Sequence, residues 1–397
     1  MAGKNKWERP SDEELEQLLQ QHGSQGAVAG QLGVPHGTIS NWYVAAQRRL
    51  GRQFKAPAKL NTPEAVEAVS REEVLETELR EARAALRKSR KLEVQEERLY
   101  NMVAEAIRTT PSRLPDAKPA KASATASNVL LAPLSDTHAG EIVDSEVMDG
   151  INEYNWEIME ERLVRWSDGI ISHKEHYADP INRLVIAGLG DMLSGSNHEE
   201  LAETNEFPIA EQCWKFSHTF AELVTRLVPH FASIDIYGVP GNHPRVKKLP
   251  ANKQVFNNFD WLMYEATGLR LANHQSVNCH FTKAGQKIIP IAGKNIYAFH
   301  GDGIRSSMPG VPWGGVMRRT NEIKKDYADR GTIIDYFLLG HFHQTNACSN
   351  IWMNGSVKGS DEYVKKQFGA GEAARQLLIN FSEKHSRVTG IHYLDLQ

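Results

Sequence analysis

Two histidines one residue apart, His341 and His343, give the sequence its clearest chemical signal, because they directly follow an apolar run. The run covers residues 333–339, is rich in Ile, Tyr, Phe and Leu, and is separated from the histidines by Gly340. Such a composition is typical of a buried strand in an α/β sheet. Side chains at positions i and i+2 of an extended segment point to the same side. Both imidazoles can therefore face one metal ion or one pair of ions beyond the end of a strand, where ligands bind in such folds.

The same pattern, an apolar run that ends in Asp, Asn or His, occurs four more times upstream. The runs cover residues 129–134, 184–189, 234–239 and 296–299. The polar residues that follow them are Asp136, His138, Asp191, Asn242, His243 and His300. Carboxylate, amide and imidazole groups at the ends of five strands predict a metal centre at one edge of a sheet.

Taken in chain order, the motifs D-x-H, G-D, G-N-H, an isolated His and G-H-x-H resemble those of the calcineurin-like metallophosphoesterase family. The resemblance covers roughly residues 128–360, and all five motifs are present. The nuclease branch of that family includes the DNA double-strand-break repair nucleases. The segments HEELAETNEFP, HGDGIR and PWGG resemble phage-encoded members in particular.

The resemblance implies an α/β fold for residues 128–397, a four-layer sandwich in which helices flank two mixed β-sheets. It also implies two divalent ions that together bind a hydroxide and a phosphate oxygen, the arrangement for in-line displacement. The ligands that it assigns to the first ion are Asp136, His138, Asp191 and His343. Those that it assigns to the second ion are Asp191, Asn242, His300 and His341, so that Asp191 bridges the pair. Imidazole with oxygen ligands suits Mn²⁺, which we favour, and also Fe²⁺ or Zn²⁺.

His243 follows the ligand Asn242, and the resemblance gives it a catalytic role rather than a metal-binding one. In the family this histidine contacts the phosphate and can protonate the leaving oxygen; the alternative is a histidine that only orients its neighbours. The family usually has an acidic residue at the next position, whereas this chain has Pro244, which can neither steady His243 nor raise its pKa. Three side chains near the motifs are candidate substrate contacts, with solvated surface residues as the alternative reading: His198, Arg245 and Arg305.

Residues 1–60 read as three short helices separated by glycine turns. Ser11 with Glu14 three residues later predicts a capping box at the first helix, and the stretch AVAGQLGVPHGTISNWY resembles helix-turn-helix modules of small phage terminase subunits and transposases. Residues near the start of a recognition helix contact base edges, and basic residues further along contact phosphates. The resulting candidate DNA contacts are Thr38, Ser40, Asn41, Arg48 and Arg49. The alternative is a helical oligomerisation or docking module.

Two segments separate this helical module from the domain with the motifs. Residues 61–109 form a Glu-, Arg-, Ala- and Leu-rich stretch that predicts a long helix. Within it, residues 64–108 either join copies of the chain as a coiled coil or act as a single spacer helix. Residues 110–127 are rich in Pro, Ala, Ser and Lys, the composition of a flexible linker.

Composition and charge set broad limits on location and partners. The net charge of −3 at pH 7 gives no global electrostatic argument for nucleic acid. The three cysteines include no CxxC pair, which fits a reducing compartment. We find no signal-peptide pattern and no apolar run of membrane-spanning length. We therefore expect a soluble, cytoplasmic protein without a membrane partner, in the host cytoplasm if a phage encodes it.

Three functional hypotheses follow from these observations. The first is a metal-dependent phosphodiesterase acting on DNA, a phage nuclease or nickase, brought to DNA by the N-terminal helices. The second is a phosphomonoesterase or protein phosphatase with a docking module. The third is a DNA-binding packaging or regulatory protein whose phosphoesterase domain is secondary.

Overall fold

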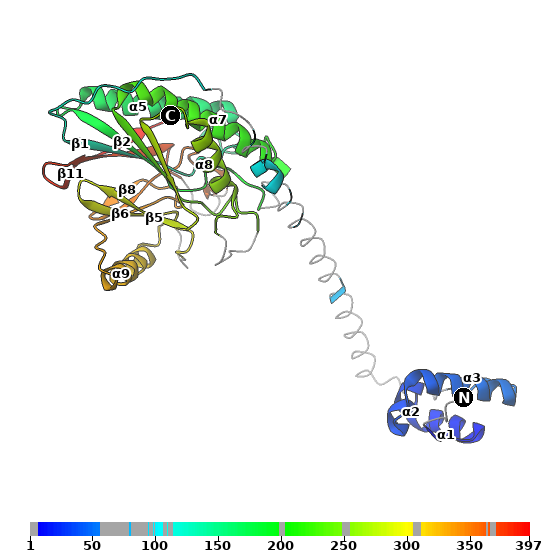
Figure 1. Ribbon diagram of the computed structural model, residues 1–397. Helices are drawn as coiled ribbons and strands as arrows, with labels where there is room; N and C mark the ends of the chain where they lie inside the picture. Colours follow the sequence, from blue (N-terminus) through cyan, green and yellow to red (C-terminus); the bar gives the residue numbers. More distant parts are fainter. Residues whose placement is uncertain are drawn as a thin grey trace. The chain divides into compact units, whose positions relative to one another are not determined.

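The computed structural model describes residues 7–55, 79–80, 94, 98, 100–105, 109, 114–197, 203–247, 255–304, 311–362, 364–365 and 371–397. The chain divides into two compact units, residues 1–89 and 90–397. Figure 1 draws the helices and strands of each unit.

The first unit contains three helices: α1 (Asp12–His22), α2 (Gln25–Leu32) and α3 (His36–Leu50). The predicted capping box is present, because Ser11 and Glu14 each accept a hydrogen bond from the backbone N–H of the other. α1 and α2 end at Gly23 and Gly33, both in the left-handed conformation that glycine adopts most readily. Residues 33–35 connect α2 to α3.

Contacts between α1 and α3 hold the three helices of this unit together. The Tyr43 hydroxyl donates a hydrogen bond of 2.7 Å to the Leu15 carbonyl inside the core. On the surface, Arg49 binds both carboxylate oxygens of Asp12, at 2.7 and 2.8 Å. Hydrogen bonds from Arg49 and then Arg9 lower the pKa of Asp12 to about 2. Arg49, a predicted DNA contact, therefore has a structural partner within its own unit.

The second unit contains two β-sheets and the helices that cover them. Its helices are α5 (Trp156–His176), α7 (Ile209–Leu227), η1 (Val228–His230), α8 (Phe259–Arg270) and α9 (Trp313–Asp329). One sheet has the order β11 (Arg387–Asp395), β10 (Arg375–Ser382), β1 (Asn128–Leu134), β2 (Ile181–Gly188), β3 (Ser233–Gly238), β4 (Val277–Phe281). The other has the order β5 (Gln286–Ile291), β6 (Lys294–Phe299), β7 (Tyr336–Leu339), β9 (Ile351–Met353), β8 (Asn346–Cys348).

These elements stack as helix, sheet, sheet and helix. One apolar cluster combines residues of both sheets, such as Val185 and Leu338, and so lies between them. α5, α7 and α8 pack on the outer face of the larger sheet, and α9 packs on the smaller one (Figure 1). Both sheets contain parallel and antiparallel pairs. The predicted mixed α/β fold, with two mixed sheets flanked by helices, is confirmed.

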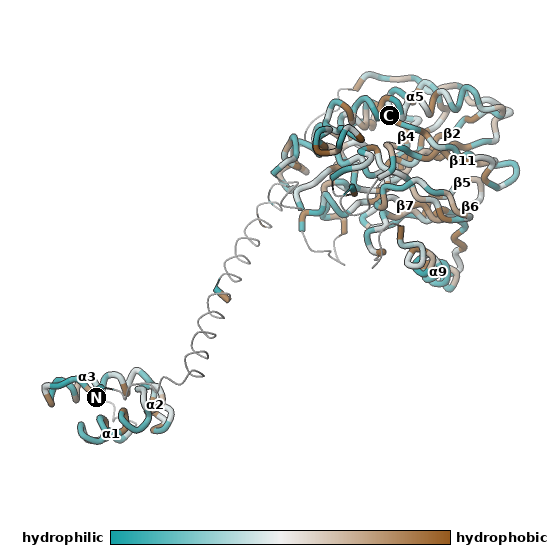
Figure 2. Tube along the Cα trace, turned by 180° about the vertical axis from the view of Figure 1, so that it is seen from behind, coloured by the Kyte–Doolittle hydropathy of each residue, from teal (hydrophilic) through white to brown (hydrophobic). Residues whose placement is uncertain are grey.

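Burial on two faces explains why the central strands are continuously apolar. Along β1, Val129 and Leu131 face the core between the sheets, whereas Leu130 and Ala132 face the helices. This alternation is the two-residue period of a strand. Figure 2 shows hydrophobic strands inside this unit and mostly hydrophilic turns on the exposed side of α9. Apolar runs of this kind were therefore a reliable signal for strands.

Part of the predicted linker belongs to the second unit. Leu114 and Ala117 pack against the core beneath the helices. The Ser123 backbone exchanges two hydrogen bonds of 2.9 Å with the Asn182 side chain, and Ala120 N–H donates to the Phe231 carbonyl. The described residues 114–127 are thus docked on the sheet domain rather than free, although their composition is that of a linker.

The predicted long helix, residues 61–109, lies mostly outside the described residues. The described ones, 79–80, 94, 98, 100–105 and 109, are helical. Tyr100 is buried in the second unit, with its ring 5.3 Å from the ring of Phe259. Self-association through residues 64–108 stays a prediction. Among the described residues, no helix is long and apolar enough to cross a membrane.

Replacing Gly238 with alanine tests the packing of α8 against the strand ends. A Cβ atom at Gly238 would lie 2.8 Å from the Tyr264 ring, so the ring must move within a close-packed core. We expect Gly238→Ala to lower the free energy of unfolding by about 1–3 kcal/mol. Thermal unfolding followed by circular dichroism measures this effect.

Gly314→Ala is the matched control, because Gly314 lies in α9 and a Cβ atom there meets nothing within 4 Å. Alanine is favoured over glycine in a helix, so this variant should unfold at or above the wild-type temperature. A Gly238→Ala protein as stable as wild type would contradict the packing described here.

Candidate metal centre

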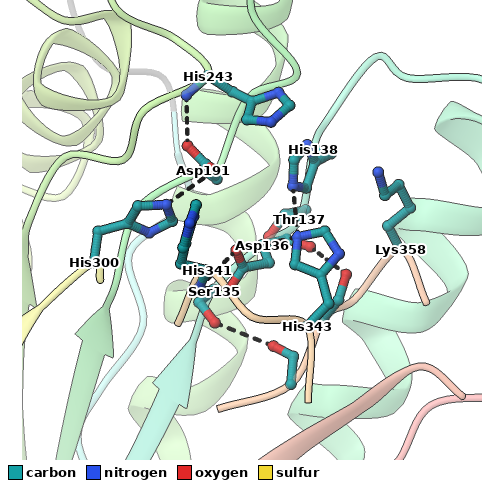
Figure 3. A network of polar contacts seen from close by, with 12 residues as sticks. Ser135, Asp136, Thr137, His138, Asp191, His243, His300, His341, His343 and Lys358 are labelled. Atoms are coloured by element: carbon teal, nitrogen blue, oxygen red, sulfur yellow. Dashed lines mark hydrogen bonds and ion pairs between the residues drawn. The ribbon is translucent and has the colours of Figure 1, made fainter. Parts of the chain in front are cut away.

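The predicted ligands lie in loops that follow five parallel strands. The strands β1, β2 and β3 run parallel in one sheet, and β6 and β7 run parallel in the other. Their carboxyl ends carry Asp136 and His138, Asp191, Asn242, His300, and His341 and His343 respectively. Figure 3 shows the labelled side chains of this set converging from the different loops.

Three groups of these side chains could each hold a metal ion, since the ligand atoms of a group lie within 4.8 Å of one another. The first group is Asp136, His138 and His343. The second is Asp191, His300 and His341. The third, His138, Asp191 and His243, connects the other two. The structure thus brings six of the predicted ligands into two groups, with Asp191 in the second and also near His138 of the first. Their binding of metal stays a prediction.

Individual distances fit ligands that share an ion. The Nε2 atoms of His138 and His343 lie 3.2 Å apart, and Asp136 Oδ1 lies 3.4 Å from His343 Nε2. His300 Nε2 lies 3.0 Å from both Asp191 Oδ2 and Asn242 Oδ1. Two donors that bind one ion at about 2.0–2.1 Å are themselves about 3 Å apart. The donor atoms therefore suit two divalent ions such as Mn²⁺, Fe²⁺ or Zn²⁺.

Burial makes positive charge at this centre necessary. Asp136 and Asp191 are 0% and 1% exposed, and a buried carboxylate is costly unless it is paired or binds a metal. Burial raises the pKa of Asp191, but the charges of His300 and then His243 outweigh it and hold that pKa well below its usual range. Burial lowers the pKa of His300, and the Asp191 carboxylate more than reverses this, to about 10.

His138 and His341, two further predicted ligands, are neutral near pH 7. Burial, followed by the charge of Lys358, lowers the pKa of His138 to about 4. Burial, followed by the charge of His300, does the same for His341. A neutral imidazole keeps the nitrogen lone pair that a metal ion needs.

Five predicted ligands adopt the left-handed backbone conformation. Their φ angles are 52° at Asp136, 48° at His138, 49° at Asp191, 69° at His341 and 52° at His343. Each such residue costs about 1–3 kcal/mol, and strain of this kind clusters at functional sites. The expectation that His341 and His343 lie on an extended segment was therefore wrong. They face the centre because their backbones turn, and they join different ligand groups.

Asp260, at the start of α8, fixes the loops that carry Asp191 and Asn242. Its carboxylate accepts hydrogen bonds from the N–H groups of Met192 at 3.1 Å, Leu193 at 3.3 Å and Gly241 at 2.9 Å. Burial and then the charge of Asp191 raise the pKa of Asp260 to about 8, while these N–H groups favour the charged form. Sequence reasoning missed Asp260, because no local pattern distinguishes it from any acidic residue in the first turn of a helix.

The loop after β1 is held in a similar way by the segment after β9. The Ser356 hydroxyl donates to the Asp136 carbonyl at 2.8 Å, and Asn354 Nδ2 donates to Ser135 Oγ at 2.9 Å. Two buried charged residues nearby also went unpredicted. Glu141 Oε2 lies 3.1 Å from His138 Nδ1, and Lys358 forms an ion pair with Glu141.

His243 lies beside His138 and Asp191, and its catalytic role stays a prediction. Its backbone N–H donates to Asp191 Oδ1 at 2.8 Å, and its Nδ1 is 3.2 Å from the Ser194 carbonyl. Arg245 reaches Asp302 at 3.7 Å, which links the loops after β3 and β6. The other two candidate substrate contacts, His198 and Arg305, lie outside the described residues.

No protein-family model and no curated protein matches the chain. Solved structures with a similar fold include vacuolar protein sorting 29 from Cryptosporidium parvum, at 9% identity and a TM-score of 0.27 over 68% of this chain and 98% of that one. A dimetal phosphatase from Danio rerio has 8% identity and a TM-score of 0.32 over 68% and 99%. Phosphopantetheinyl hydrolase from Mycobacterium tuberculosis has 10% identity and a TM-score of 0.26 over 61% and 93%. Identities and scores this low carry no information about activity, which depends on the side chains described above.

Replacing Asp260 with asparagine tests whether this carboxylate positions the ligand loops. In the wild-type protein both carboxylate oxygens accept hydrogen bonds from backbone N–H groups. An asparagine amide has only one oxygen, so its NH₂ group would face at least one of these N–H donors. We expect Mn²⁺ affinity, measured by isothermal titration calorimetry, to fall by roughly 10–100-fold. The free energy of unfolding should fall by about 1–3 kcal/mol.

Asp235→Asn is the control, because Asp235 is also a carboxylate of low exposure but pairs with Arg183 and His280 instead of the ligand loops. It should leave Mn²⁺ affinity close to wild type. Equal Mn²⁺ affinity in the wild-type and Asp260→Asn proteins would rule out the positioning role.

Proposed function

We propose that this chain is a metal-dependent phosphodiesterase that acts on DNA, a nuclease or nickase of the kind that phages encode. The observation that carries the proposal is the position of Asp191. This carboxylate belongs to the group with His300 and His341, and its oxygen also lies within 4.8 Å of a ring nitrogen of His138, a member of the group for the first ion. A carboxylate shared between two ligand sets is what a two-ion phosphoesterase requires.

The chain's own residues have distinct tasks in this reaction. When bound, the two ions activate a water molecule and neutralise charge on the phosphate. The histidines and carboxylates hold that pair in place, with the strained loops fixing their directions. His243 supplies a proton to the leaving oxygen. Arg245, held near Asp302, contacts a phosphate of the substrate.

The residue that follows His243 is Pro244, at a position where the family usually has an acidic residue. Nδ1 of His243 lies near the Ser194 carbonyl, a neutral acceptor that can fix the ring but adds no negative charge. A phosphodiester needs less help at its leaving oxygen when a metal ion takes the developing charge. This arrangement therefore supports a phosphodiester substrate.

The first unit supports DNA as the polymer that carries the phosphodiester. A three-residue turn connects α2 to α3, as in helix-turn-helix modules. Asn41 and Arg48 are exposed on α3, Thr38 and Ser40 are partly buried, and Val44 between them is 45% exposed. We assign base contacts to the first part of α3 and a phosphate contact to Arg48.

Asp191→Asn tests the catalytic part of the proposal. Wild-type protein with Mn²⁺ should nick or linearise supercoiled plasmid and hydrolyse bis-p-nitrophenyl phosphate. Both activities should fall by more than about 100-fold in the variant. That is the upper range for losing a residue that only hydrogen-bonds to a metal ligand. Asp235→Asn should retain both.

Hydrolysis of p-nitrophenyl phosphate with an intact plasmid would contradict the proposal and favour a phosphomonoesterase whose N-terminal helices dock on a protein. DNA binding without turnover of any of these substrates would favour a packaging or regulatory protein.

Arg48→Ala tests the DNA-binding part. Loss of one phosphate contact should weaken binding to a DNA duplex and reduce the slope of log affinity against log salt by about one. Fluorescence anisotropy of a labelled duplex at several salt concentrations measures both. Arg387→Ala, which removes an exposed cation from β11, should change neither. Unchanged affinity and an unchanged slope in Arg48→Ala would contradict the proposal that Arg48 of α3 contacts a DNA phosphate.

A further inference from the structure

A buried cluster of charged side chains lies beside His138. Glu141, Lys358 and Asp361 have side chains that are 7%, 2% and 8% exposed. Lys358 Nζ lies 2.7 Å from Glu141 Oε1 and forms a second ion pair with Asp361. The cluster holds two carboxylates and one ammonium group, and its end at Glu141 touches His138 Nδ1 at 3.1 Å. Side chains of these types are almost never buried unless they are paired.

Backbone contacts fix the cluster on both sides. Glu141 N–H donates to the His138 carbonyl at 3.0 Å, so the carboxylate is held in a tight turn next to the imidazole. The Lys358 carbonyl accepts hydrogen bonds from Asn152 at 2.9 Å and from Arg162, a residue of α5, at 2.6 Å. Figure 3 shows Lys358 beside His138. The contact of Glu141 with His138 is therefore built into the fold.

We propose that Glu141, itself held by Lys358, is a positioning residue for the first metal ion. A carboxylate at Nδ1 keeps the imidazole proton on that nitrogen. The lone pair of Nε2 then faces His343 Nε2 at 3.2 Å and the ion that these two histidines share. With the proton on Nε2 instead, His138 could not bind the ion. The inference rests on the metal-binding part of the proposed function and on no particular substrate.

His300, one of the two histidines assigned to the second ion, has a backbone carbonyl rather than a carboxylate at its Nδ1. Nδ1 of His300 lies 2.8 Å from the Leu189 carbonyl, which fixes the ring without a charge. The two metal positions therefore differ in the Nδ1 partner of one of their histidines, which is a carboxylate for His138 and a carbonyl for His300. Loss of the Glu141 charge should weaken the first position and spare the second.

The cluster provides its own matched control. Glu141 and Asp361 are carboxylates of similar burial that bind the same ammonium group, but only Glu141 lies against His138 Nδ1. Glu141→Gln leaves Lys358 paired with Asp361, and Asp361→Asn leaves it paired with Glu141. Each variant removes one ion pair of the cluster, and Asp361→Asn also alters the carboxylate that accepts the Val364 N–H at 2.7 Å. A purely structural role therefore predicts at least as large a loss for Asp361→Asn as for Glu141→Gln.

The experiment is a Mn²⁺ titration of wild type and both variants by calorimetry, with the metal content after dialysis and the unfolding temperature in EDTA measured in parallel. We expect two ions per wild-type chain. One of them should bind roughly 10–100-fold more weakly to Glu141→Gln, and both should bind normally to Asp361→Asn. Two normal sites in Glu141→Gln, or equal losses in both variants with equal falls in unfolding temperature, would overturn the proposal.

Histidine-selective ¹⁵N NMR of the metal-free wild-type protein shows which ring nitrogen of His138 carries the proton. This measurement does not depend on whether a variant folds. We expect the His138 proton on Nδ1, and a proton on Nε2 would overturn the proposal. A wild-type protein that binds no Mn²⁺ would refute the proposed function, whereas normal wild-type binding with an insensitive Glu141→Gln refutes only the role of Glu141.

Discussion

The structure of the second unit depends on the buried carboxylate of Asp191. It lies 3.0 Å from His300 Nε2 and accepts a hydrogen bond from the His243 backbone, so it connects the loops of three strands. Burying a carboxylate is costly unless positive charge surrounds it. Here histidines supply part of that charge, and two divalent ions, when bound, would supply the rest. The backbone approaches this side chain closely, since a Cβ atom at Gly241 would lie 2.1 Å from Asp191 Oδ1. Asp191 therefore limits which residues its neighbours can be.

The two-sheet architecture explains how so many ligands reach one place. The sheets pack face to face, and the loops after β1, β2, β3, β6 and β7 all lead to the centre. Those loops contain left-handed residues that cost stability. Hydrogen bonds that the loops donate to Asp260, and one that Ser356 donates to the Asp136 carbonyl, restrain them. A rigid core thus supports a strained site, a division common in functional proteins.

The sequence was informative where the physical signal is local. Strands buried on both faces must be apolar throughout, and polar residues directly after them were visible as candidate ligands. The partners of the ligands were not visible, because they come from distant parts of the chain: Lys358 pairs with Glu141 across a separation of 217 residues. Local sequence patterns also differed from the structure in two places. The residues around His341 are turned rather than extended, and the linker-like residues 114–127 dock on the sheet domain.

Anomalous diffraction from crystals grown with Mn²⁺ tests the central claim most directly. We expect two anomalous peaks about 3.5–4 Å apart, with Asp191 between them, His138 and His343 at one peak and His300 and His341 at the other. A single peak, or two peaks that do not share Asp191, would contradict it.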